Sequence, residues 1–245
     1  MESVAKALGM SIVTGLSGNE IYCIDQLEMT PGDLVIGNSV FSMGFVGSLA
    51  SAARTLAGGE VTQVTRVIHD GRKLALDRLL QETKQRGGTA VTGVPSDLLW
   101  HGGGVEFLSV GSSLKHQPGE LGEFSTSRGG QELFCQLDSG FKPLHFAFGN
   151  VAYSIGISGG LGGFFQSLAR GEVTQYSEVF NKTRHLALER IEEDAKSYGA
   201  NAVVGIRTSI LPLMGTTEML MIGTASHHPA LGPQFSERPI TSHLT

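Results

Sequence analysis

Two cysteines and two histidines recur at one fixed spacing in this chain, and their side chains are well suited to bind a metal ion. Cys23 returns as Cys135 and His116 returns as His228, so both pairs share an offset of 112 residues. Thiolates and imidazoles are ligands for zinc, copper and related metals. If chains assembled around an axis, these side chains would meet at the interfaces between modules. Cys23, Cys135, His116 and His228 are therefore candidate metal ligands.

A structural explanation of the same residues stays open. A free cysteine usually lies buried as a small hydrophobe, and both cysteines stand in short apolar runs that we predict to be strands. The chain has neither a Cys-x-x-Cys motif nor the ligand spacing of known zinc sites. His227 and His228 are adjacent, so in an extended segment they point to opposite sides. A transition metal ion is the one cofactor that these residues suggest.

The sequence lacks the motifs that usually mark an enzyme. No Gly-x-Ser-x-Gly follows a strand, no His-Glu-x-x-His occurs, and neither common phosphate-binding glycine pattern is present. The net charge of −5 comes with no basic face, which argues against binding nucleic acid through its phosphates. We expect a protein without catalytic activity, unless a site is assembled between chains.

The bulk composition favours a folded protein of one or two domains. The chain has 245 residues, of which 40% are hydrophobic, enough for packed cores. Two cysteines do not make a disulfide framework. Neither a signal peptide nor an apolar run of about 18 residues stands out. We therefore expect a soluble cytoplasmic protein without a membrane span.

An internal duplication organises the chain. Gly37-Asn38 returns as Gly149-Asn150, and the run Gly-Glu-Val-Thr-Gln at 59–63 returns at 171–175, again 112 residues later. Chance cannot keep this register without a gap from Gly18 to His116. We place a first module at residues 1–116, a second module at 117–226, and a flexible tail able to dock a partner protein at 227–245.

Each module is predicted to contain strands around one long helix. Strands are expected at 20–24, 33–37, 90–94 and 106–111, and again at 132–135, 145–149, 202–206 and 218–224. Apolar residues three or four apart predict helices at 60–86 and 172–198, which Gly87 and Gly199 terminate. Gly71 lies within the first helix, where it costs about 1 kcal/mol relative to alanine and favours a break or kink. Pro95 should shorten its strand or place it at an edge.

One further feature is shared by the two modules, and another distinguishes them. Glycine-rich segments precede both helices, at 42–59 and 154–171, and close packing between modules or around a pore explains them better than phosphate binding. These segments carry the repeated pairs Gly44/Gly47 and Gly156/Gly159. The first module also has Trp100, His101 and three glycines, predicted as a loop, where the second has Pro212, Leu213 and Met214.

Repeated charges suggest a structural pairing. Arg72, Arg78 and Glu106 return as Arg184, Arg190 and Glu218. We expect an Arg–Glu pair between elements, inside a module or between modules, with a structural role. Glu60 and Glu172 lie where the long helices start, where a carboxylate complements the helix dipole. We interpret both as start signals that face a neighbouring module.

The second module resembles the YbjQ family of small bacterial proteins. The resemblance rests on Gly-Glu-Val-Thr-Gln-Tyr at 171–176, Arg-His-Leu-Ala-Leu-Glu-Arg at 184–190, Gly-Ala-Asn-Ala-Val-Val-Gly-Ile at 199–206 and Met-Leu-Met-Ile-Gly-Thr-Ala at 219–225. It extends to the first module through the repeat, where Pro95 and residues 100–104 depart from the pattern.

The resemblance implies a fold, an assembly and a label. The fold is α+β, with two tandem two-layer modules of dodecin-like β-α-β-β order, each with one main helix on an antiparallel or mixed sheet. The assembly is a homo-oligomeric ring, a pentamer, with the modules in stacked or concentric layers. The label is heavy-metal binding, without a defined ligand set. We expect a ring-forming scaffold or binding protein; the alternative is a metal-binding or metal-sensing protein.

Overall fold

Two α+β modules follow each other in the computed structural model, which describes residues 11–42, 44, 59–117, 119, 121–154, 174–213, 216–233 and 235. The first module contains α2 (Gly18–Gln26), β1 (Thr30–Ser42), β2 (Gly59–Glu60), α4 (Thr62–Gln85), β3 (Ala90–Thr92), β4 (Asp97–His101) and β5 (Gly104–Lys115). After β6 (Phe124–Ser125), the second contains α5 (Gly130–Asp138), β7 (Lys142–Ser154), α7 (Thr174–Ser197), β8 (Ala202–Leu213) and β9 (Thr216–His227). The predicted fold class is confirmed.

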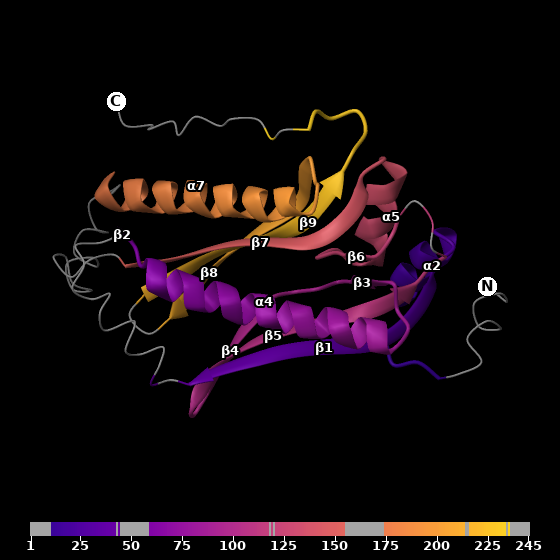
Figure 1. Cartoon of the computed structure of the whole chain (residues 1–245), viewed down its shortest axis with the longest axis horizontal. Coiled ribbons are helices and arrows are strands. Elements are labelled where there is room, and N and C mark those ends of the chain that lie inside the picture. The colour runs from indigo at the N-terminus through magenta and orange to yellow at the C-terminus, as the bar shows by residue number, and fades with distance from the viewer. Residues whose placement is uncertain are drawn as a thin grey trace.

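The main elements stack as sheet, helix, sheet and helix (Figure 1). The first sheet has the strand order β1-β5-β3-β6, with β4 paired to β5, and the second has the order β2-β7-β9-β8. Helix α4 contacts β1 and β5 of its own module and also β7 of the second module. Helix α7 contacts β7 and β9 from the other side. The first sheet and α7 therefore form the two ends of the stack.

Short helices open both modules, so the predicted strands at 20–24 and 132–135 are wrong. In α2 the Ser17 hydroxyl accepts from the backbone N–H of Glu20, and the Glu20 carboxylate accepts from the backbone N–H of Ser17. This capping box satisfies donors that a helix start leaves unpaired. Periodicity cannot distinguish a strand from a helix in so short an apolar run. The Ser-x-x-Glu pattern was the signal for a helix.

The two long helices lie within two residues of their predicted bounds. Gly71 does not interrupt α4. A Cβ atom at this position would lie 2.4 Å from ring carbons of Phe107, so the glycine makes room for that ring against the helix. The strands cross under the helices just as closely, since a Cβ on Gly37 would lie 2.0 Å from the carbonyl oxygen of Ala75. Packing, rather than flexibility, accounts for these glycines.

The closing strands differ between the modules. Strand β3 stops at Thr92, and Gly93 turns the chain with a φ of 72° before β4 resumes at Asp97. The predicted shortening near Pro95 is confirmed, whereas the predicted loop at Trp100 and His101 is wrong, because both residues belong to β4. In the second module β8 runs without a break and only shifts register after Val204.

The glycine-rich segments and the segment that connects the two modules are described to different extents. The glycine-rich segments, with Gly47, Gly156 and Gly159, lie outside the described residues except at their ends. The connector between the modules is described in part, and its strand β6 extends the first sheet by pairing in parallel with β3. Because β6 pairs Phe124 with Ala90, the start of the second module completes the edge of the first sheet.

Candidate functional site: the interface between the modules

Arg72 of α4 and Glu218 of β9 form a buried ion pair at the interface between the modules. Nε of Arg72 donates to Oε1 of Glu218 at 2.9 Å, and Nη2 donates to Oε2 at 2.6 Å, so the contact is bidentate. Both side chains are 0% exposed. The expected Arg–Glu pair is confirmed, and it joins one module to the other. Removing one partner of such a pair costs about 3–5 kcal/mol, since the remaining charge is left buried and unpaired.

The rest of the Arg72 guanidinium is held by its own module. Nη1 donates to the carbonyl oxygen of Ser96 at 2.7 Å and to its hydroxyl at 2.9 Å. The guanidinium carbon lies 5.5 Å from the centroid of the Phe107 ring. Ser96 lies in the interruption between β3 and β4. The interruption that follows Gly93 therefore helps to orient the arginine toward the second module.

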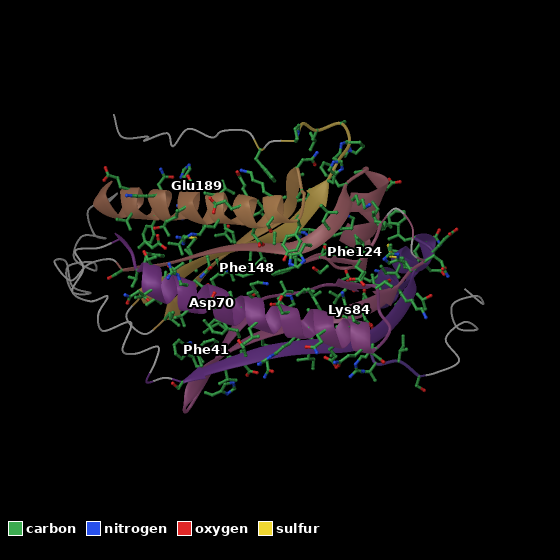
Figure 2. The ribbon with its side chains drawn as sticks, viewed as in Figure 1. Phe41, Asp70, Lys84, Phe124, Phe148 and Glu189 are labelled. Atoms are coloured by element: carbon green, nitrogen blue, oxygen red, sulfur yellow. The ribbon has the colours of Figure 1, made fainter. Side chains whose placement is uncertain are left out.

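Polar and aromatic contacts extend the interface along β7. The Asn150 amide nitrogen donates to the carbonyl oxygen of Thr65 at 3.1 Å, and its Oδ1 lies 3.3 Å from Nδ1 of His69. The Thr65 hydroxyl accepts from the backbone N–H of Ala152 at 2.9 Å. Phe148 lies between α4 and α7 (Figure 2), with its ring centroid 4.9 Å from that of His69. The stretch of β7 that carries Phe148, Asn150 and Ala152 is thus covered by α4.

A short strand of the first module also crosses to the second sheet. Strand β2 pairs antiparallel with the end of β7. Oε1 of Glu60 accepts from Nη2 of Arg190 at 2.7 Å, while Nη1 of Arg190 donates to the carbonyl oxygen of Asn150 at 2.7 Å. The expectation that Glu60 faces a neighbouring module is confirmed, whereas its expected role at the helix start is wrong, because Glu60 belongs to β2 and the first turn of α4 contains no acidic residue. The side chain of Glu172 lies outside the described residues.

His145 is the titratable group that the interface perturbs most clearly, and no sequence motif announced it. Burial and, to a smaller extent, the nearby Lys73 cation lower the pKa of His145 to about 4, while the Asp77 carboxylate acts in the opposite direction. The ring stacks on Tyr198 at 3.7 Å, and its Nδ1 lies 3.2 Å from the Ser125 hydroxyl. Burial also raises the pKa of Asp194, whose carboxylate accepts from a backbone N–H of β7. Because its pKa is lowered to about 4, His145 is neutral near pH 7.

The connector joins the two sheets through hydroxyl groups. The Ser125 hydroxyl accepts from the backbone N–H of Phe146 at 2.8 Å. The hydroxyls of Thr126 and Thr224 lie 2.8 Å apart, and the backbone carbonyl of Thr126 accepts from Val94 at 3.1 Å. Thr126 therefore contacts an element of each module and fixes their relative position.

The two candidate cysteines lie in helices α2 and α5, which pack against each other. Their predicted place in apolar strands is wrong. Cys23 is half-buried, Cys135 is exposed, and both are free thiols. Cys135 lines an open pocket of about 460 Å³ together with Arg128, Glu132 and Gln136. The structure thus brings their two helices together and leaves Cys135 accessible.

The two candidate histidines lie after the last strands of the modules, and neither lines the pocket that contains Cys135, although His228 packs on Phe141, which does. The His116 ring stacks on Phe124 at 5.6 Å, and the His228 ring lies 4.6 Å from Phe141. Within the described part of the chain, no three histidine, cysteine or acidic side chains are grouped so that they could hold a metal ion. The assignment of Cys23, Cys135, His116 and His228 as ligands stays a prediction.

The predicted tail begins against the second module. The Asn201 amide donates to the carbonyl oxygens of His228 and Leu231 at 3.0 and 3.1 Å. Residues 236–245, and with them most of the predicted docking segment, lie outside the described residues. Among the helices that the structure describes, none is long and apolar enough to cross a membrane.

The fold and the interface define a class of protein in which two α+β modules are fused and the helix of the first packs on the sheet of the second. The family described as "Putative heavy-metal-binding", the YbjQ family, matches residues 24–109 and 141–228. The chain belongs to this family, with one copy in each module. The resemblance seen in the second module is thereby confirmed and extends to the first.

Relatives differ in how much of the chain they match. The encapsulin nanocompartment protein Rv1762c of Mycobacterium tuberculosis is 28% identical over 235 residues, covering 91% of this chain and 88% of the relative. A UPF0145 protein of Thermotoga maritima is 40% identical over 78 residues, or 31% of this chain and 74% of the relative. A UPF0145 protein of Clostridioides difficile is 44% identical over 66 residues, or 26% and 59%. The first relative therefore spans both modules.

Proposed function

We propose that this chain is the building block of a homo-oligomeric scaffold and has no catalytic role of its own. The observation that carries the proposal is the way the modules pack: the helix of one module is buried on the sheet of the next through a desolvated ion pair. A surface of this kind is suited to assembly. The first sheet still exposes apolar side chains, namely Ile36, Val40, Leu99 and Trp100.

The relatives support an assembly role. The relative that spans both modules is named an encapsulin nanocompartment protein. The YbjQ resemblance adds a ring of five chains as the expected stoichiometry. In this role the protein acts by presenting a repeated surface, so its activity depends on the integrity of its interfaces.

Native mass spectrometry on tag-free protein tests the proposal. We expect a discrete oligomer of identical chains, with five chains as the expected number. A protein that stays monomeric at tens of micromolar would overturn the scaffold role. A defined oligomer of another size would keep the role and correct the number of chains.

The same spectra test the metal-binding alternative, which the description of the family favours. A stoichiometric transition metal that is lost from the Cys23→Ser/Cys135→Ser variant, but retained when the exposed His227 is changed to glutamine, would assign metal binding to the cysteines. A fully assembled protein without bound metal would rule out the metal-binding alternative, and the scaffold role would be the one that remains.

A further inference from the structure

The contact between the modules pairs two unlike surfaces. The first module contributes its long helix and the edge of its sheet, whereas the second contributes the outer face of its sheet and its leading segment. Because the modules are repeats, each possesses both kinds of surface. One of each is used inside the chain. The helix and sheet edge of the second module, and the sheet face and leading segment of the first, remain without a partner module. On α7 the Phe235 ring of the tail lies 5.4 Å from Nζ of Lys196, so docking at that end of the helix displaces this ring. Unlike surfaces of this kind join copies head to tail.

The unused sheet face matches the used one residue for residue. Phe148, Asn150 and Ala152 of β7 lie under α4 and are 3%, 0% and 0% exposed. Their counterparts in β1 are Ile36, Asn38 and Val40. Ile36 is 50% exposed, Val40 is 62% exposed, and Asn38 is also exposed. The same strand positions that are buried in the second module are therefore open in the first.

The ion pair has an unassembled counterpart. Arg184 of α7 corresponds to Arg72, and Glu106 of β5 corresponds to Glu218. Arg184 is exposed and forms no ion pair with any described residue. Glu106 accepts from Asn38 at 2.7 Å and lies 2.6 Å from Nε2 of the exposed His101. The two halves of a second Arg–Glu pair thus belong to the two outermost layers of the stack, the first sheet and α7.

The sheet edges show the same difference: an edge that is covered in one module is open in the other. In the first module the edge of β3 is covered by β6, which pairs Ser125 with Val91. Their counterparts are Val13, which is 75% exposed, and Val203 in the edge strand β8. Farther along β8, Ile206 and Ile210 are 40% and 52% exposed. An exposed apolar edge strand is a template for pairing with another chain.

From these three matches we infer that the second module of each chain docks on the first module of the next chain through a repeat of the contact seen inside the chain. Arg184 pairs with Glu106 of the neighbouring chain, α7 covers β1, and the edge of β8 receives the segment that contains Val13. The inference rests on the proposed scaffold function and names its interface. Closure gives a ring in which first and second modules alternate, so the number of modules in the ring is even and the modules do not form separate layers.

The present partners of Glu106 show how the interface would form. Asn150, the counterpart of Asn38, bonds to α4 and not to Glu218. When α7 of another chain arrives, Asn38 turns to that helix and releases the carboxylate to the incoming arginine. His101, which is exposed, moves aside or stays as a second partner. No covalent step or cofactor is needed.

Charge reversal on tag-free protein tests this interface. Arg184→Glu and Glu106→Arg each place like charges in a desolvated contact, and we expect each to raise the dissociation constant between chains by at least about 100-fold. The double variant Arg184→Glu/Glu106→Arg restores opposite charges, and we expect it to recover most of the assembly. Lys182→Glu is the matched control, because it reverses an exposed charge two residues from Arg184 on the same helix.

Sedimentation velocity gives the assembly state, and circular dichroism with thermal unfolding checks that every variant folds. Assembly lost in both single variants, recovered in the double variant and unchanged in Lys182→Glu supports the inference. Full assembly in folded Arg184→Glu would overturn this interface and leave the scaffold role intact. A wild-type protein that is monomeric throughout would overturn both.

Discussion

Helices α4 and α7 occupy the same place in their modules, yet they are buried to different depths. Toward their own sheets both helices bury the same positions completely: Ala75 and Leu79 in α4, Ala187 and Ile191 in α7. On the adjoining face Arg72 and Leu76 are 1% and 2% exposed, whereas Arg184 is exposed and Leu188 is half-buried. The same helix pattern therefore packs on its own sheet in both modules. Whether the adjoining face is also buried depends on whether another module docks on it.

Breaking the ion pair on the buried side should have the largest effect. Arg72→Ala leaves Glu218 buried without a partner, and we expect it to lower the free energy of unfolding by about 3–5 kcal/mol. Arg184→Ala, measured on dissociated chains, should change it by less than about 0.5 kcal/mol, because that side chain is exposed. Urea unfolding at low protein concentration measures both. Equal losses would mean that the two helices are not different in the single chain.

Acid should weaken the second module through His145. Its folded-state pKa of about 4 lies below the unfolded value of 6.5, so the unfolded chain binds the proton first. The stabilisation is complete above pH 6.5 and is lost as the pH falls toward 4, by about 3 kcal/mol. His145→Gln should flatten this part of the stability curve, whereas the exposed His227→Gln should not. Stability profiles that coincide for wild type and His145→Gln would contradict the assignment.

Exchange of packing residues between the modules should have an intermediate effect. Gly71 and Phe107 of the first module correspond to Thr183 and Met219 of the second. Gly71→Thr alone collides with the Phe107 ring, and we expect a loss of about 1–3 kcal/mol in unfolding free energy. Adding Phe107→Met should recover most of it. A double-mutant cycle by chemical denaturation measures the coupling, and strictly additive losses would argue against this compensation.

The smallest effect is expected where the first module replaces the His145 stack by an ion pair. Arg86 and Asp33 correspond to Tyr198 and His145 and lie 3.5 Å apart, with side chains 47% and 37% exposed. Exposed pairs contribute about 0–1 kcal/mol. Asp33→Ala should therefore change the melting temperature only slightly, and less than Tyr198→Ala, which removes the stack on His145. The reverse order would show that the exposed pair is the stronger contact.

Much of the fold could be predicted because the repeat and the apolar period act locally. The long helices and the strands around Leu34 and Met219 follow from spacing alone. The helix at Cys23 was missed because a short apolar run fits either a helix or a strand, and only the Ser17–Glu20 capping box resolves it. Trp100 was assigned to a loop because the glycines that follow it mark a turn, and that turn closes a hairpin.

The site itself could be predicted only in part. The repeated charges at Arg72 and Glu218 suggested a pair, and the structure shows that it links the modules. No spacing rule indicates that α4, and not α7, is covered on two faces, because their sequences are alike. The burial of His145 in β7 depends on Ser125 of β6 and on Tyr198, which follows α7, so three segments that are separate in the sequence meet there. Such convergence has no local signature.

The position of α4 between two sheets has a consequence for the newly made chain. Arg72 precedes its carboxylate partner by 146 residues, so the first half of the chain emerges from the ribosome long before the strand that carries Glu218. Until then the first half exposes an apolar helix face and a cation that lacks its counter-ion. Contacts of such long sequence separation slow folding and extend the time during which an intermediate can aggregate. In the fused arrangement the contact between the modules can therefore form only late in translation, after the strand that carries Glu218 has been made.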